Sequence, residues 1–219
     1  MALDLYAHPF SSFCQKALIA LYEAGTPFAL KMLDAEHPEN FAALKAAWPF
    51  GRFPALKDGG RWVIEATCII EHLDVFHPGP ERMIPEDRDV ALEVRFLDRV
   101  FDNDVSGQQQ ALIYNALRPE GSRDAYGEAL AREKLEVSYA WLDDVLKGRR
   151  WAGGDRFTLA DCAAGPALFY AHWTHPIDPR FETLLAYRRR LMARPSFARA
   201  IEEARPYRAY FPLGVPAEG

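Results

Sequence analysis

The hydrophobic and polar positions near the start of the chain change their period at residue 9. Residues 3–8 alternate between apolar and polar or aromatic side chains, which is typical of a half-buried strand, and Pro9 ends the alternation. From Cys14 the apolar residues recur at helical spacing, until Gly25 and Pro27 end the pattern. The pattern predicts a strand and an amphipathic helix joined by a tight turn.

Polar residues at the start of this helix fall into two groups. Gln15, Lys16 and Glu23 lie off the apolar stripe and are predicted to face water. Ser12 and Gln15 have the spacing of a capping box, in which the Ser12 hydroxyl accepts from a free backbone N–H. Ser11 then lies one residue outside the cap, where the unpaired N–H groups and the helix dipole favour an anionic ligand. The two serines could exchange these roles.

Residues 28–76 continue the alternation of strands and helices. The pattern predicts a strand over 28–33 and a short helix over 37–48, followed by an extended run that begins near Pro54. A hairpin turn at Asp58-Gly59-Gly60 returns the chain antiparallel over 61–64, and a helix follows. The predicted order is therefore strand, helix, strand, helix, hairpin, helix.

The segment FHPGPERMIPED, residues 76–87, holds three prolines and a glycine and is predicted to be an interdomain linker. Every apolar pattern after it has a helical period, beginning with one long helix that runs to about Leu117. A later helix begins at Thr158, whose capping box is completed by Asp161. The second part of the chain is thus expected to be all helical.

Composition and charge exclude several classes of function. The net charge of -5 over 219 residues gives no basic footprint for nucleic acid or an anionic membrane, and no apolar run approaches the ~20 residues of a membrane helix. Cys14, Cys68 and Cys162 are odd in number and far apart, which favours reduced thiols. His172 and His175 have a ligand-like spacing without partners, so no metal is predicted. We expect a soluble cytoplasmic protein.

Four segments in this order resemble the cytosolic glutathione transferase family. They are SSFCQKALIAL from Ser11, PFGRFPALKDGG from Pro49, IEATCIIEHLD from Ile64 and FTLADCAAGPAL from Phe157. The resemblance covers nearly the whole chain and implies an α/β thioredoxin-like N-terminal domain (βαβαββα) plus an all-α C-terminal helical bundle domain. The implied division is a glutathione-binding domain over 1–77, a linker over 78–87 and a helical domain over 88–219 that contributes the electrophile pocket.

Within that family the resemblance is to the serine-type, bacterial theta-like and zeta-like transferases. It implies that Ser11 takes the position of the residue that contacts the sulfur of the co-substrate glutathione. A thiol with a pKa of about 8.5 is mostly protonated at neutral pH, and each unit by which the pKa falls requires about 1.4 kcal/mol. A donated hydrogen bond with help from the helix dipole is of that size. Ser11 would then be a donor to the thiolate, with Ser12 and Cys14 as the alternatives.

The resemblance also implies a set of residues that bind the rest of glutathione. Phe53 precedes a proline expected to be cis, and its backbone would pair with the cysteinyl unit. Glu65 matches the residue that meets the γ-glutamyl amine, whereas Ala66 replaces the usual serine, so that a hydroxyl is lost unless Thr67 compensates. The expected glutathione-binding residues are Arg52, Phe53, Pro54, Glu65, Ala66, Thr67 and His37.

The second substrate is expected to be a small hydrophobic electrophile, as in the detoxification that the family carries out. Its pocket is predicted to lie between the first turn and the long helix. The predicted lining residues are His8, Phe10, Phe13, Phe101, Asp104, Val105 and Gln108. A homodimer is implied, with contacts near Phe50 and along the helix from Asp89. The alternatives are a non-catalytic module for binding or interaction, and a glutathione-dependent thiol oxidoreductase that uses Cys14.

Overall fold

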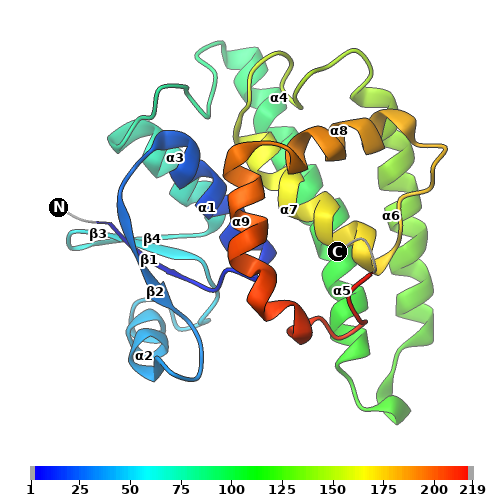
Figure 1. Ribbon diagram of the computed structural model, residues 1–219, viewed down its shortest axis with the longest axis horizontal. Helices are drawn as coiled ribbons and strands as arrows, with labels where there is room; N and C mark the ends of the chain where they lie inside the picture. Colours follow the sequence, from blue (N-terminus) through cyan, green and yellow to red (C-terminus); the bar gives the residue numbers. More distant parts are fainter. Residues whose placement is uncertain (1–2, 217–219) are drawn as a thin grey trace.

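The computed structural model describes residues 3–216, and a four-stranded mixed sheet forms its first part (Figure 1). The central strand β1 (Leu3–Ala7) pairs in parallel with β2 (Phe28–Met32) and antiparallel with β3 (Ala55–Asp58). The last strand, β4 (Arg61–Ile64), pairs antiparallel with β3, which gives the order β2-β1-β3-β4. These strands confirm the predicted alternation.

Helices cover both faces of the sheet. On one face lie α1 (Ser12–Ala24) and α3 (Ala66–Phe76), packed over the inward side chains Leu3 and Leu5. On the other lies α2 (Pro38–Ala47), whose Leu44 packs with Tyr6. The period of two along β1 therefore divides its side chains between two cores, as expected for a strand covered on both faces.

The segment after α3 carries no helix or strand until residue 88, and the elements named beyond it are all helices. The long helix consists of α4 (Arg88–Arg99), a seven-residue π-helical stretch η1 (Val100–Ser106) and α5 (Gly107–Ala116). A short turn η2 (Glu120–Ser122) leads to α6 (Ala125–Val145), which packs against α5. The thioredoxin-like and all-helical architecture is thereby confirmed, and the exact domain boundaries stay a prediction.

The centre of the helical part is α7 (Leu159–Thr174), of which only His172 is not fully buried. Its capping box is present as predicted, because the Asp161 carboxylate accepts from the Thr158 backbone N–H at 2.9 Å. Around it lie α8 (Glu182–Met192), α9 (Pro195–Ala204) and the terminal turn η3 (Arg205–Tyr210).

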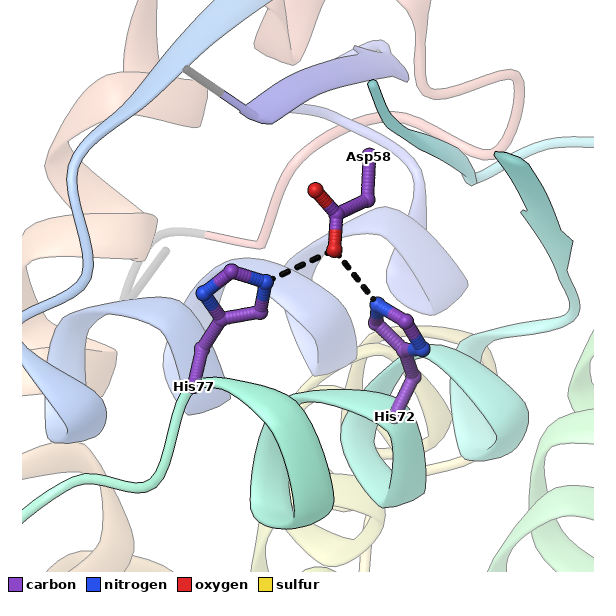
Figure 2. A group of neighbouring side chains, drawn as sticks. All are labelled: Asp58, His72 and His77. Atoms are coloured by element: carbon purple, nitrogen blue, oxygen red, sulfur yellow. Dashed lines mark hydrogen bonds and ion pairs between the residues drawn. The ribbon is translucent and has the colours of Figure 1, made fainter. Parts of the chain in front are cut away.

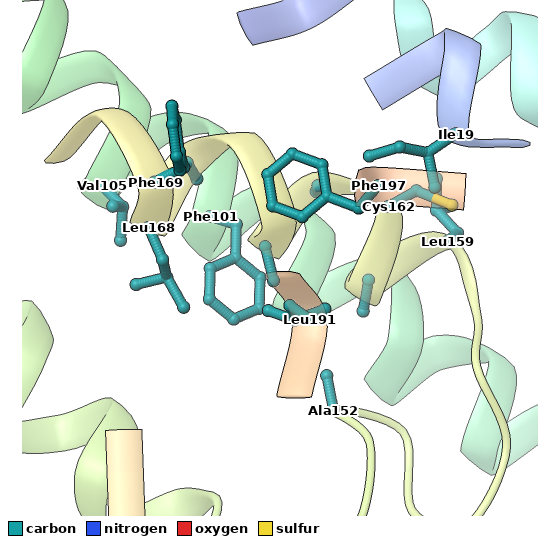
Figure 3. Close-up of a cluster of buried hydrophobic side chains, with 14 of the residues drawn as sticks. Ile19, Phe101, Val105, Ala152, Leu159, Cys162, Leu168, Phe169, Leu191 and Phe197 are labelled. Atoms are coloured by element: carbon teal, nitrogen blue, oxygen red, sulfur yellow. The ribbon is translucent and has the colours of Figure 1, made fainter. Parts of the chain in front are cut away.

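The first helix joins the two parts of the molecule into one body. α1 packs against α7 and α9 as well as against α3, and Figure 3 shows Ile19 of α1 close to side chains of α7 and α9. None of the helices in residues 3–216 is long and apolar enough to cross a membrane.

The expectation that polar residues of α1 face water is wrong. Gln15 and Lys16 are fully buried, and Glu23 is half-buried with an ion pair to Arg194 at 2.5 Å. Because α1 is covered by the sheet side and by α7 and α9, little of its surface remains for solvent. Its buried polar side chains have partners in the other half of the chain.

Candidate functional site

The turn between β1 and α1 places Ser11, not Ser12, at the N-cap. Ser11 has extended backbone angles (φ -80°, ψ 127°), and its Oγ accepts from the Cys14 backbone N–H at 3.4 Å. Ser12 is the first residue of the helix, so the predicted cap at Ser12 is wrong. A capping serine uses its oxygen as an acceptor and keeps its O–H proton to donate elsewhere.

The side chain of Gln15 does not complete a capping box with Ser12. Its amide donates to the Pro9 carbonyl at 3.0 Å and to the Tyr170 hydroxyl at 2.9 Å. Tyr170 comes from α7, so a tertiary contact takes the group that a capping box would need. Local spacing cannot show such competition.

Two cavities meet at Ser11 and Phe53. The larger has a volume of about 720 Å³ and lies between the first domain and the long helix; its lining residues are Ser11, Phe13, Arg52, Phe53, Pro54, Ile64, Glu65, Asp102, Asn103, Gly107, Gln110 and Tyr114. The smaller has a volume of about 410 Å³, and its lining residues are His8, Phe10, Ser11, Leu33, Asp34, Ala35, Phe53 and Tyr210. The helix N-terminus therefore opens into a cleft with room for two small molecules.

The wall of the larger cavity opposite Ser11 has an unusual backbone. The Phe53–Pro54 peptide bond is cis, as expected. Glu65 has φ 75°, a left-handed value that costs a residue other than glycine roughly 1–3 kcal/mol. Strain of this kind persists where the surroundings enforce it and clusters at ligand sites. Arg52 and Glu65 also bring one positive and one negative side chain to this cavity.

Ala66 and Thr67 follow at the start of α3. Ala66 offers a backbone N–H from the first turn of the helix and no hydroxyl. The Thr67 hydroxyl accepts from Lys16 Nζ at 2.8 Å and donates to Asp98 Oδ2 at 3.0 Å. It is committed to a network behind the cavity, so Thr67 does not replace the missing serine hydroxyl.

The network behind Thr67 is a buried set of charges. Lys16 Nζ lies 2.5 Å from Asp98 Oδ1 and 2.7 Å from Asp102 Oδ2. Burial raises the pKa of Asp102, and the nearby Lys16 opposes that effect. Since Asp102 also lines the larger cavity, the network connects α1 to the cavity wall.

His37 is not among the residues that line either cavity. Its Nδ1 lies 2.7 Å from Asp34 Oδ1, and 43% of its side chain is exposed. The hydrogen bond to Asp34 raises the pKa of His37. Its role toward the glycine carboxylate of glutathione stays a prediction.

Three of the seven residues predicted for the electrophile pocket line a cavity, and their role toward an electrophile stays a prediction. His8 and Phe10 line the smaller cavity and Phe13 the larger. Phe101 and Val105 are fully buried in the core, as Figure 3 shows, so their assignment to the pocket is wrong.

Asp104 and Gln108 do not line either cavity. The Asp104 carbonyl accepts from the Ser138 hydroxyl, and the Gln108 amide donates to the Asn103 carbonyl at 3.4 Å. The helix residues that do reach the cleft were missed by the sequence analysis: Asp102, Asn103, Gly107, Gln110 and Tyr114. Their spacing is also helical, so periodicity gave two candidate faces and no means of choosing between them.

None of the three cysteines of the chain is bound in a disulfide, and Cys14 is poorly suited to chemistry. Burial raises the pKa of the Cys14 thiol to about 12, an effect that hydrogen bonds from Ser11 and His8 only partly offset. A nucleophilic cysteine needs a lowered pKa and access to solvent.

One group of side chains in residues 3–216 could hold a metal ion (Figure 2), and none of its three residues lines either cavity. His72 Nε2 and His77 Nε2 lie 3.0 Å and 2.7 Å from the same oxygen of Asp58. These hydrogen bonds already tie the end of β3 to α3, and we interpret the group as a structural tie.

The two histidines weighed as ligands from the sequence do not converge. The His172 Nδ1 accepts from the Ile177 backbone N–H, whereas His175 Nε2 lies 2.8 Å from Glu136. Each side chain has a separate structural partner.

Comparison with known families agrees with this geometry. The model of the glutathione S-transferase N-terminal domain matches residues 5–81, and that of the glutathione S-transferase C-terminal domain matches residues 108–210. A solved glutathione S-transferase from Methylobacterium radiotolerans JCM 2831, in complex with glutathione sulfonate, is 30% identical over 92% of this chain and 95% of that chain, with a TM-score of 0.79. The chain belongs to the glutathione S-transferase family.

Curated relatives of similar length carry different names. A probable maleylacetoacetate isomerase of Vibrio cholerae is 27% identical over 94% of this chain and 98% of its own length. The FtsZ-localized protein A of Caulobacter vibrioides is 26% identical over 88% of each chain. These relatives are distant, and the predicted serine-type subclass stays a prediction.

Proposed function

We propose that this protein is a glutathione transferase that holds the glutathione sulfur as a thiolate and directs it at a hydrophobic electrophile. The observation that supports this most directly is Ser11. Its oxygen caps the helix, its O–H proton is a donor for which the Cys14 thiol and a bound glutathione sulfur would compete, and it lies where two cavities meet. A structural relative of 30% identity was solved with glutathione sulfonate.

The Ser11 hydroxyl would act as a hydrogen-bond donor to the sulfur. Lowering a thiol pKa from about 8.5 to 6.5 needs about 2.7 kcal/mol. A hydrogen bond to a charged group contributes roughly 1.5–3 kcal/mol, and the N-terminus of α1 adds a favourable dipole. The two effects together are sufficient.

The larger cavity suits the rest of glutathione. The backbone of Phe53, before the cis proline, would pair with the cysteinyl unit, and Glu65 would bind the γ-glutamyl amine. The γ-glutamyl carboxylate would be met by the Ala66 N–H alone, because the Thr67 hydroxyl is engaged with Lys16 and Asp98. We therefore expect weaker glutathione binding than a serine at position 66 would give.

A matched pair of variants tests the role of Ser11. Ser11→Ala should lower kcat/KM for 1-chloro-2,4-dinitrobenzene by about 10- to 100-fold, the factor that corresponds to 1.4–2.7 kcal/mol. Ser12→Ala, one residue further on, is the control and should stay near wild type. Titration of the bound thiolate by its ultraviolet absorbance should show a higher pKa only in Ser11→Ala. Equal activity of Ser11→Ala and wild type would refute the role.

A non-catalytic module is the second candidate, favoured by the missing hydroxyl at Ala66 and by the relative named for its location on FtsZ. Isothermal titration separates the two, since such a module should bind no glutathione at millimolar concentration. A thiol oxidoreductase that depends on Cys14 is disfavoured, because burial raises the pKa of that thiol to about 12.

We also propose a homodimer in the cytoplasm. The proposal is supported by exposed apolar side chains at Phe50 and along α4, where Leu92 and Phe96 are exposed. Apolar side chains that share one face favour a protein contact.

A further inference from the structure

The three side chains that tie the end of β3 to α3 converge on one point (Figure 2). Asp58 ends β3, His72 lies in α3, and His77 follows the last residue of that helix. One oxygen of Asp58 lies 3.0 Å from His72 Nε2 and 2.7 Å from His77 Nε2. One ligand atom from each residue lies within 4.8 Å of the other two. Two imidazoles and a carboxylate are a donor set that transition metals use in proteins.

The spacing of these atoms is close to what a tetrahedral ion needs. Zn²⁺ binds imidazole nitrogen and carboxylate oxygen at about 2.0–2.2 Å, so its ligand atoms are about 3.4 Å apart. The two contacts to Asp58 would therefore lengthen by about 0.4–0.7 Å. Asp58 directly precedes the turn at Gly59 and Gly60, and His77 lies just outside its helix. Both are at the ends of elements, where a small shift breaks no strand or helix.

The ring of His72 is held in place and can present a bare nitrogen to a metal. It is buried and packs against Phe76, with 4.7 Å between the ring centroids. Its Nδ1 is a buried atom that has no hydrogen-bond partner in residues 3–216. A neutral imidazole that binds a metal through Nε2 carries its proton on Nδ1. Since no donor holds Nδ1 as an acceptor, this tautomer is reached by giving up only the hydrogen bond to Asp58.

The carboxylate supplies a negative charge, and the group is open to water on one side. Within the described residues no lysine or arginine forms an ion pair with Asp58. The side chain of Asp58 is 21% exposed and that of His77 is 27% exposed, against 5% for His72. A metal ion would thus replace two hydrogen bonds and no stronger ion pair, and solvent can supply the fourth ligand.

We propose that Asp58, His72 and His77 form a binding site for a divalent transition-metal ion, and that Zn²⁺ with one water suits it best. The bound ion joins the hairpin of β3 and β4 to the end of α3 in place of the two hydrogen bonds. The inference is independent of the proposed function, because none of the three residues lines either cavity of the cleft.

The affinity should be lower than that of a structural zinc site. The second nitrogen of a ligating histidine usually donates to an acceptor, and loss of such an outer partner costs roughly 10- to 100-fold in affinity. His72 Nδ1 has no such acceptor in residues 3–216. We therefore expect a dissociation constant in the micromolar range.

Isothermal titration with zinc chloride and thermal unfolding test the proposal, on the full chain after treatment with a chelator. Wild type should bind one Zn²⁺ per chain and should unfold at a higher temperature with zinc, because the ion binds the folded state. Calcium chloride should give no such shift, since Ca²⁺ takes oxygen ligands. Asp58→Asn and His77→Gln keep an acceptor and a donor for the hydrogen bonds. Each should weaken zinc binding by more than about 10-fold, because each removes a direct ligand.

Two control variants remove other candidate zinc ligands. His37→Gln also takes a histidine from a pair with aspartate, but His37 and Asp34 bring only two ligand atoms together, 2.7 Å apart. Cys68→Ser removes the exposed thiol of the chain. Both variants should bind zinc with the wild-type affinity.

Two results would overturn the proposal. One is that wild type binds no zinc at submillimolar concentration. The other is that Asp58→Asn and His77→Gln bind zinc as tightly as wild type, which would mean that the ion binds elsewhere on the surface. Unfolding curves in the presence of chelator show which variants are folded, and if one of the two is not, the other carries the comparison.

Discussion

Replacing Lys16 with methionine tests the buried charges that join α1 to the long helix. The side chains of Lys16 and Asp98 are each 1% exposed, and the Lys16 ammonium lies within 2.7 Å of carboxylate oxygens of both Asp98 and Asp102. Methionine keeps most of the apolar stem and removes the charge. The variant therefore separates the electrostatic contribution of Lys16 from its packing.

The expected loss follows from what stays buried. Removing one partner of a buried pair costs about 3–5 kcal/mol, because the remaining charge is left without compensation. Arg99 lies 2.5 Å from Asp98 Oδ2 and still compensates that carboxylate in part. We therefore expect a loss near the lower limit, about 3 kcal/mol in the free energy of unfolding. For a chain of this size that corresponds to a fall in Tm of about 6–12 °C.

Equilibrium unfolding in urea measures this loss in the free energy of unfolding. Two further variants test whether the buried charge causes it. Lys147→Met removes an exposed charge paired with Asp144, with 62% of the lysine side chain exposed, and should cost less than about 0.5 kcal/mol. Lys16→Met combined with Asp98→Asn should be less destabilised than the sum of the single variants, because the amide removes the unpaired charge.

A loss below about 1 kcal/mol for Lys16→Met would contradict the reasoning, since it would mean that water reaches the site and screens it. The reasoning would also be contradicted if the loss of unfolding free energy in the double variant equalled the sum of the two single losses, because that would show no coupling between Lys16 and Asp98.

Two other predictions concern the long helix and the hydrogen bonds that join His72 and His77 to Asp58. Phe101→Ala should lower the free energy of unfolding by about 3–5 kcal/mol, as expected for a fully buried aromatic side chain. Gln110→Ala should leave stability unchanged and alter KM for glutathione, because Gln110 lines the larger cavity. Unfolding and steady-state kinetics on both variants would expose a wrong choice of helix face. Hydrogen bonds from His77 and then His72 lower the pKa of Asp58 below its unfolded value of about 3.9, so their stabilising effect is present above that pH and is lost as the pH falls toward the lower folded pKa (Figure 2). Asp58→Asn should flatten the fall in stability from pH 5 to pH 2.5, and an acid-unfolding curve that keeps the wild-type slope would count against the tie.

The fold could be predicted from the sequence because its elements depend on local pattern. The alternation around Leu3 and Leu5 set the first strand, and the spacing of Thr158 and Asp161 set the start of α7. These predictions hold in the folded protein because the face on which each side chain lies follows from its position in the strand or helix.

The parts that could not be predicted depend on contacts between distant segments. The cap was expected at Ser12, but the Gln15 amide that would complete that capping box hydrogen-bonds to a tyrosine of α7. Lys16 was expected in water because its partner Asp98 lies 82 positions further along the chain. The face of the long helix that meets the cleft is set by how α4, η1 and α5 pack on α7, and two faces of that helix have the same period.

The two cavities have only Ser11 and Phe53 in common, and this arrangement bears on the order in which ligands arrive. A tripeptide in the larger chamber would leave the smaller one with its own lining and its own opening. In the proposed reaction neither compound has to wait for the other, so the kinetic scheme should be random rather than ordered, with the sulfur and its target meeting at one serine.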